Sequence, residues 1–313
     1  MSFIVAGAVT FTLVTSLVGP ATSQRAEGPL RVVVSVPPLE GIIEGLLPDD
    51  AEVRIVVRPG ASAHGYVPTP EDAVAIARAD LVFLVGLGID TAVERAAGTA
   101  RVNVVRMADL AGIDPGRGAQ TVSHDHSHDH DHSHDHRADT LDPHLWLDPV
   151  LVGQIVEPLS TEVASAAEAA GFRIDSMRLE SDRHILVGRI DAIAESMISS
   201  LGPHAGAEVI TVHSAFGRIF DRVGIIEAAV VQPAATSEPT PGEIEAATTA
   251  AASADGIFVE PQLESGFARR LSELTGVPLG TLDPLGSGDW FTMMEANRNE
   301  LVRVLSARDP SGG

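Results

Sequence analysis

Histidine is concentrated in one short stretch of this 313-residue chain. Seven histidines alternate with Asp and Ser at His124, His126, His128, His130, His132, His134 and His136. Imidazole suits zinc, copper and nickel, and the interleaved carboxylates attract cations, so we expect weak metal binding here. An i, i+2 spacing defines no single tetrahedral geometry, which indicates several exchanging sites. The stretch has no apolar residue to bury, so we expect a disordered His-rich loop at residues 115–140. A solvated insertion without a selected role stays open as the alternative.

Five further histidines are scattered along the chain, at His64, His144, His184, His204 and His213. His184 and His204 are in contexts typical of surface residues. His64 lies in a loop of small residues after an expected strand, and His213 directly follows an apolar run at 208–212. Ligands of open α/β sheets bind at the carboxyl ends of strands, which is where these two residues are expected. Taken singly, each histidine also fits an ordinary structural role.

Short β-branched runs bounded by Pro and Gly indicate the elements that position these residues. In the first half, strands are expected at 30–36, 52–57, 81–85 and 102–105. In the second half, they are expected at 208–212, 228–231, 256–259 and 277–280. Helices are expected at 37–47 and after the capping sequences at Thr69 and Thr240. The sequence therefore predicts an α/β fold of two similar lobes, each a mainly parallel β-sheet flanked by helices.

A segment without proline from Gly171 to Gly202 separates the two halves. Its apolar residues recur with helical period at Leu186, Ile190, Ile193, Met197 and Leu201. One rigid helix of about 25 residues, roughly 37 Å long, would join the lobes. We therefore predict an N-terminal lobe at 25–160, a connector at 161–203 and a C-terminal lobe at 204–313.

The first 24 residues are typical of a signal peptide. Residues 3–18 are almost entirely apolar, and Ala21-x-Ser23 supplies a small-residue cleavage pattern. The chain has no cysteine, which excludes disulfides, thiolate metal sites and a lipid-anchor Cys. A net charge of −22 argues against a nucleic-acid partner and favours a cationic ligand. We expect a soluble periplasmic protein.

Four segments resemble the zinc/manganese solute-binding proteins of ABC importers, in the order found in that family. They are residues 60–79, Asp142 to Pro149, Thr211 to Phe216, and Asp283 to Gly286. Within that family, the high-affinity zinc uptake type with a His-rich loop is the most similar. The similarity extends from about Leu30 to Leu305. One departure is Ala63, where the family usually has proline before its first ligand.

The resemblance implies a metal site made of His64 and His144 from the first lobe, with His213 and Asp283 from the second. Three imidazoles and one carboxylate would complete a four-coordinate zinc ion. Manganese-type relatives tend to carry a carboxylate at the position of His213, so this histidine favours zinc. Histidines bind metals only when neutral, so we expect the affinity to fall as the pH drops through about 6.5.

The function that the resemblance implies is capture and delivery of a metal, without catalysis. Zn²⁺ would be the transported ligand, held between the lobes of a monomer and passed to a membrane permease with its cytoplasmic ATPase. Three alternatives stay open: a manganese-binding homologue, a secreted zinc-dependent hydrolase, and a zinc buffer without a transporter. The chain has no HExxH-type pair, which argues against the hydrolase.

Overall fold

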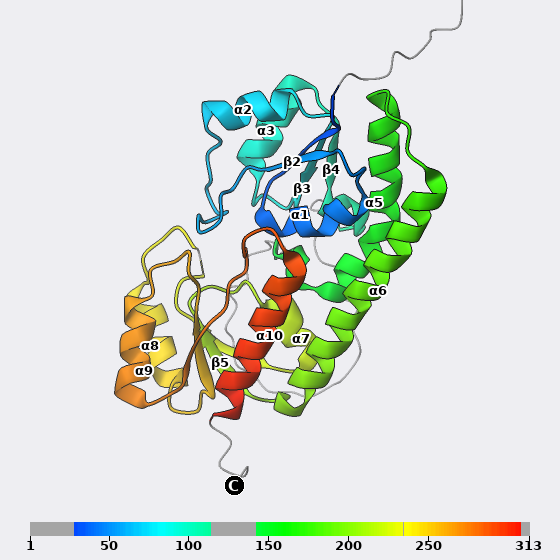
Figure 1. The fold of residues 1–313 in the computed structure, drawn as a ribbon. Helices are drawn as coiled ribbons and strands as arrows, with labels where there is room; N and C mark the ends of the chain where they lie inside the picture. Colours follow the sequence, from blue (N-terminus) through cyan, green and yellow to red (C-terminus); the bar gives the residue numbers. More distant parts are fainter. Residues whose placement is uncertain (1–27, 114–141, 234, 308–313) are drawn as a thin grey trace, which may run out of the picture.

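The computed structural model describes residues 28–113, 142–233 and 235–307, and Figure 1 shows two lobes stacked along one axis. The first lobe contains a four-stranded parallel sheet in the order β2-β1-β3-β4. Its strands are β1 (Arg31–Val34), β2 (Glu52–Ile55), β3 (Leu81–Leu84) and β4 (Val104–Arg106). Its helices are α1 (Pro37–Ile43), η1 (Glu44–Leu46), α2 (Pro70–Ala77), α3 (Thr91–Ala100) and α4 (Met107–Leu110).

The second lobe repeats this topology, with four parallel strands in the order β6-β5-β7-β8. Its strands are β5 (Glu208–Thr211), β6 (Ile226–Val230), β7 (Gly256–Val259) and β8 (Leu279–Thr281). Its helices are η3 (Gly202–His204), α7 (Gly217–Val223), α8 (Pro241–Ala250), α9 (Gly266–Thr275) and α10 (Trp290–Ser306). The prediction of two similar α/β lobes with parallel sheets is therefore confirmed.

The local signals of the sequence correspond to the observed element starts. Thr69 and Asp72 form a capping box at the start of α2, and Thr240 and Glu243 form one at the start of α8. These boxes satisfy backbone donors that a helix N-terminus otherwise leaves free. Some strand positions differ by one or two residues from the expectation: β4, β6 and β8 lie at 104–106, 226–230 and 279–281. The expected helix at 37–47 is α1 followed by the 3₁₀ turn η1.

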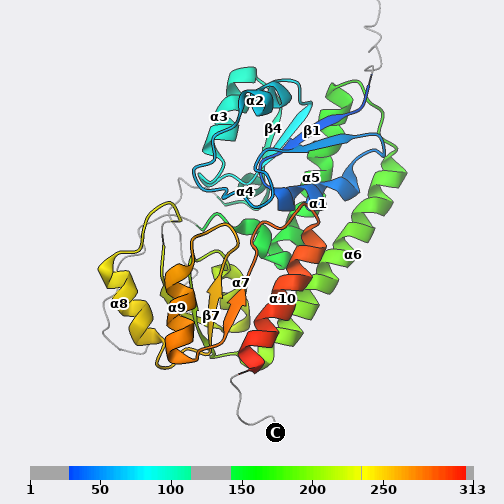
Figure 2. The same ribbon diagram turned by 60° about the vertical axis from the view of Figure 1, so that its left-hand side comes forward.

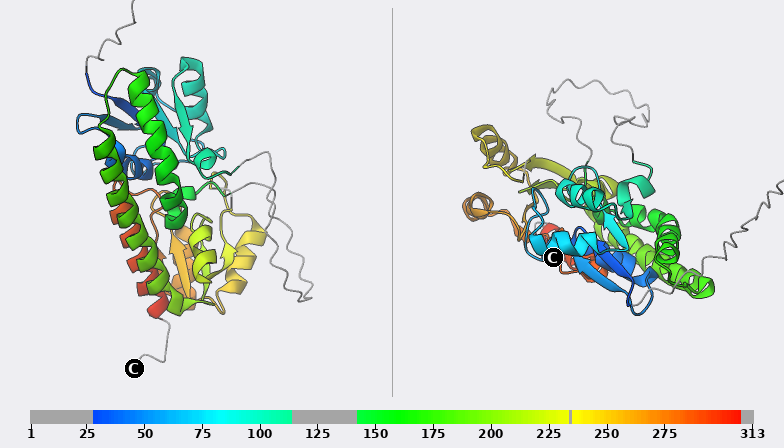
Figure 3. Two further views of the ribbon diagram at one scale, coloured as in Figure 1. Left: turned by 90° about the vertical axis from the view of Figure 1, so that its right-hand side faces the viewer. Right: turned by 90° about the horizontal axis from the view of Figure 1, so that it is seen from above.

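Two long helices pack side by side along one side of the molecule, and one of them, α6 (Ser176–Leu201), runs past both lobes (Figure 3). This connector has 26 residues, as the apolar period predicts, and is preceded by α5 (Pro149–Ala169). Because α5 is continuous through position 160, the proposed boundary between lobe and connector falls inside a helix. The C-terminal helix α10 lies beside α6 and also contacts α1 (Figure 2). The lobes are thus joined by a packed group of helices and not by α6 alone.

One apolar core is continuous through both lobes. It contains Val32 of β1, Val209 of β5, Ile190 of α6 and Leu301 of α10, all with exposures of 1% or less. The outer sheet faces have separate cores, one beneath α2 and α3 and one beneath α8 and α9. Strands buried on both faces explain the continuous apolar runs in the sequence. A shared central core favours small tilts of the lobes over wide separation.

Candidate metal centre

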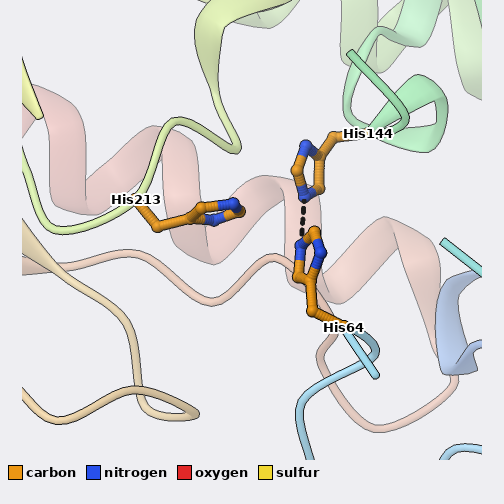
Figure 4. Close-up of side chains that lie close together, drawn as sticks. All are labelled: His64, His144 and His213. Carbon is orange, nitrogen blue, oxygen red and sulfur yellow. Dashed lines mark hydrogen bonds between the residues drawn. The ribbon is translucent and has the colours of Figure 1, made fainter. Parts of the chain in front are cut away.

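Three histidines from three distant segments meet between the lobes. His64 lies in the loop between β2 and α2, His144 immediately precedes η2 (Leu145–Leu147), and His213 follows β5. Gly60 and Gly65 adopt left-handed backbone angles on either side of His64, which glycine tolerates best. Figure 4 shows the rings of His64 and His144 facing each other, with the ring of His213 directed toward both.

The spacing of the three rings suits a small cation. Their centroids are 4.8, 5.0 and 5.3 Å apart, and one nitrogen from each lies within 4.8 Å of the others. The Nε2 atoms of His64 and His144 are 3.2 Å apart. Two nitrogens bound tetrahedrally to zinc at about 2.0–2.1 Å would be separated by about 3.3 Å. His64 and His144 therefore already have the spacing of zinc ligands, and a nitrogen of His213 lies within 4.8 Å of a nitrogen of each.

The rings line a cavity of about 20 Å³, which has room for roughly one water-sized group. His144 and His213 are 4% and 6% exposed, whereas His64 is partly exposed. Apolar groups surround the nitrogens, including Ile89, Trp146 and Leu285. Such surroundings strengthen the interaction of a cation with its ligands because little water competes.

Two carboxylates orient two of the three rings. The Nδ1 atom of His144 is 2.8 Å from Asp142 Oδ1, and that of His213 is 3.3 Å from Glu260 Oε1. A carboxylate accepts a hydrogen bond from Nδ1–H, which leaves Nε2 as the lone-pair donor for a metal. His64 Nε2 then donates to His144 Nε2 when no ion is bound. Among the described residues, Nδ1 of His64 has no hydrogen-bond partner, so its tautomer is free to change when a metal binds.

The electrostatics of the site favour neutral imidazole at His64. The pKa of this ring is lowered from 6.5 to about 3, chiefly by burial and in addition by the neighbouring His213 and His144. Burial raises the pKa of Asp142, but hydrogen bonds from His144 and the charge of Arg218 outweigh it, and the net pKa is lowered. His64 is therefore available as a lone-pair donor well below pH 6.5.

The segment carrying His144 is fastened to the second lobe, although the sequence assigns it to the first. Asp142 accepts a hydrogen bond at its carbonyl from Arg218 of α7, at 2.8 Å. Asp148 forms two hydrogen bonds with Arg222 of α7, at 2.6 and 2.7 Å. The Trp146 indole donates to the Pro284 carbonyl at 2.6 Å. His144 and His213 are thus held together, and His64 is the one of the three histidines that comes from a loop of the first lobe.

Asp283, the fourth residue of the predicted set, lies outside this group. Among the described residues, the cluster of possible ligand atoms within 4.8 Å of one another consists of the three histidines. Asp283 Oδ1 accepts hydrogen bonds from Gln262 Nε2 at 2.7 Å and from the backbone of Leu285 and Gly286 at 3.0 Å. Gln262 itself lines the cavity. Whether Asp283 is a ligand stays a prediction.

The remaining histidine predictions fall elsewhere. The seven histidines from His124 to His136 lie outside the described residues, as does the predicted signal peptide. His184 is on the surface of α6 with 69% of its side chain exposed, and His204 is half-buried at η3. Sequence reasoning missed Glu260 and Gln262 and gave no role to Asp142. Asp142 lies in one of the four segments that carry the family resemblance, whereas Glu260 and Gln262 lie between them, within the wider range over which the similarity extends.

Residues 32–304 match the model of the family described as ZnuA, zinc-uptake complex component A, periplasmic. The chain belongs to this family. The ZnuA family comprises metal-binding solute-binding proteins of ABC importers and is not a family of enzymes. In the part of the chain that the structure describes, no helix is long and apolar enough to cross a membrane.

The relatives of this chain include proteins named for zinc and proteins named for manganese. The chain is 26% identical over 305 residues to a manganese-binding lipoprotein of Halalkalibacterium halodurans, with 91% of each chain covered. It is also 26% identical over 302 residues to the high-affinity zinc uptake system protein ZnuA of Brucella abortus, covering 86% of this chain and 87% of the relative.

Solved structures show the same fold. A crystal structure of ZnuA aligns with a TM-score of 0.69 at 20% identity, over 88% of this chain and 98% of that one. The periplasmic zinc-binding protein TroA of Treponema pallidum aligns with a TM-score of 0.70 at 18% identity, over 89% and 99%. At these sequence identities the likeness concerns the fold alone.

Proposed function

We propose that this protein is a periplasmic solute-binding protein that captures Zn²⁺ between its lobes and delivers it to an ABC permease. The observation that carries the proposal is the meeting of His64, His144 and His213 at one small cavity between the lobes. Membership of the ZnuA family supports it, as does the zinc-uptake relative from Brucella abortus. The predicted signal peptide at residues 1–24 would export the chain.

Zinc is favoured over manganese by the chemistry of the donors. Zinc binds imidazole readily, whereas manganese prefers carboxylate, carbonyl and water oxygens. The described cluster offers three imidazole nitrogens, and the carboxylates of Asp142 and Glu260 contact the Nδ1 atoms of His144 and His213. The relative named for manganese shows that family membership alone does not decide the metal, so the donor set is the argument for zinc.

The placement of the ligands suggests how binding would be signalled. His64 comes from the first lobe, whereas His144 and His213 are held to the second. A zinc ion bound by all three would fix the loop of His64 against the second lobe. The packed helices α5, α6 and α10 oppose wide opening, so we expect small lobe tilts and loop movement. The permease and its ATPase would then act on the metal-bound form of a monomer.

Zinc titration against a chromophoric chelator tests the metal site. Replacing His64, His144 or His213 with alanine should remove the tight site. The loss of zinc affinity should exceed the roughly 10–100-fold that is typical when a residue hydrogen-bonded to a metal ligand is lost. His184→Ala is the matched control, because this histidine is exposed on α6 and distant from the cavity. Unchanged tight binding in all three variants would reject the site. Competition between Zn²⁺ and Mn²⁺ in the wild-type protein tests the choice of metal.

Delivery to the permease needs a separate experiment. Zinc uptake into vesicles containing the cognate permease and ATPase should depend on this protein and should be lost with His213→Ala. Tight zinc binding without any stimulation of uptake would favour the zinc-buffer alternative.

A further inference from the structure

Gln262 is placed at the cavity with one end of its amide unpartnered. The residue follows β7 and lines the cavity together with the three histidines. Its Oε1 atom is buried and has no hydrogen-bond partner among the described residues. A buried acceptor without a partner costs about 1–3 kcal/mol, so an unpartnered oxygen at a ligand cavity calls for a donor or a cation.

The chemistry of its neighbour fixes the orientation of this amide. Gln262 Nε2 lies 2.7 Å from Asp283 Oδ1. A carboxylate only accepts hydrogen bonds, so the NH₂ end of the amide must face Asp283 and the carbonyl oxygen must face away from it. The backbone nitrogens of Leu285 and Gly286 donate to the same carboxylate oxygen. Asp283 therefore fixes the orientation of the Gln262 amide by accepting a hydrogen bond from its NH₂ group.

We propose that Gln262 Oε1, and not the carboxylate of Asp283, is the oxygen that faces the bound metal ion. Asp283 is then a positioning residue that acts through Gln262. This inference rests on the proposed function, because it concerns the same cavity and the same cation. A neutral amide oxygen beside three imidazoles gives a nitrogen-dominated donor set, which suits zinc better than manganese.

Two substitutions separate the roles of Gln262 and Asp283. Gln262→Leu removes the oxygen at similar volume and should lower the affinity for Zn²⁺ by about 10–100-fold, the range for losing a group that supports a metal site. Asp283→Asn keeps an oxygen that can accept from Gln262 and from the backbone, so the affinity should change by less than about threefold. Chelator competition measures both, and thermal unfolding of the metal-free variants checks their folding.

The visible spectrum of bound Co²⁺ gives a second readout, because its d–d bands report the ligands of the ion. Gln262→Leu should shift these bands, whereas Asp283→Asn should leave them as in the wild type. A spectral change and an affinity loss in Asp283→Asn equal to or larger than those in Gln262→Leu would overturn the proposal, as would no effect of Gln262→Leu. If Gln262→Leu fails to fold, the Asp283→Asn spectrum still decides.

His213→Ala, measured in parallel, distinguishes failure of this inference from failure of the proposed function. Loss of tight binding in His213→Ala together with wild-type behaviour of Gln262→Leu would reject the role of Gln262 alone. Retention of tight binding in His213→Ala would reject the three-histidine site itself.

Discussion

Asp142 offers a sharp test of how the site is organised, because it touches His144 but faces away from the cavity nitrogen. Its Oδ1 is 2.8 Å from His144 Nδ1 and 2.9 Å from the His144 backbone nitrogen. Replacing Asp142 with alanine removes both contacts and leaves the ring without a fixed tautomer. Loss of such an outer partner typically costs 10–100-fold in metal affinity, or about 1.4–2.7 kcal/mol.

Two variants at this position separate the hydrogen bond from the charge. Asp142→Asn retains an oxygen that can accept from Nδ1, so we expect a loss near the lower end of this range, about 10-fold. Asp142→Ala should approach 100-fold. Glu273→Gln is the control for net charge, because this carboxylate is exposed on α9, where it pairs with Arg270.

Zinc competition with a chelator measures the affinities at fixed pH and ionic strength, and thermal unfolding of the metal-free proteins monitors the fold. A zinc affinity of Asp142→Ala within about twofold of the wild type would contradict the orienting role of Asp142, because the ring would then be oriented without the carboxylate. An equal loss in Glu273→Gln would show that overall charge, and not the contact, sets the affinity.

Three further predictions follow from the described contacts and from the sequence. The pKa of His64 is lowered to about 3, below its ordinary 6.5, so stability that depends on the neutral ring is present above pH 6.5 and is lost as the pH falls toward 3. Below pH 6.5, the unfolding free energy of the metal-free wild type should therefore decrease relative to that of His64→Gln. The decrease should be at most about 1.4 kcal/mol per pH unit, and smaller because the ring is partly exposed. Parallel curves of unfolding free energy against pH for the two proteins would contradict this. Trp146→Phe should lower the free energy of unfolding, measured in urea, by about 1–3 kcal/mol, because the Pro284 carbonyl loses its buried donor. A loss no larger than that of an exposed substitution such as Met177→Ala would contradict a stabilising role of this hydrogen bond. Deleting residues 123–136 should reduce the number of zinc ions bound in equilibrium dialysis while leaving one tight site, and disappearance of that site would make the tract the primary binder.

The sequence is informative about the fold wherever the signal is local. Strands such as β3 and β7 are buried on both faces and therefore stand out as apolar runs. The connector α6 shows its buried face as a helical period, and Thr69 and Thr240 mark helix starts through their own side chains. The edge strand β6 is less clear because it begins at the half-exposed Ile226.

The joining of the lobes is less predictable because it depends on contacts between distant segments. The packing of α10 against α1 and α6 brings residues near the C-terminus to the first lobe. The segment of His144 is fixed by Arg218 and Arg222, more than 70 positions away in the chain. No local pattern in the sequence indicates such contacts.

The candidate site was predictable in part, through the family motifs and not through spacing. The resemblance selected His64, His144 and His213, and the structure brings these three together. It also selected Asp283, whose hydrogen bonds instead lead to Gln262. The pH expectation assumed ordinary imidazoles, whereas the lowered pKa of His64 moves proton competition at this ring below 6.5. Burial and neighbouring charge produce that shift, and neither is visible before the chain is folded.

The most direct test is an anomalous difference map collected at the zinc absorption edge from crystals of the full chain with one equivalent of Zn²⁺. We expect one dominant peak at the cavity between the lobes, about 2.0–2.1 Å from a nitrogen of each of His64, His144 and His213. A dominant peak elsewhere, with none among these three histidines, would contradict this expectation.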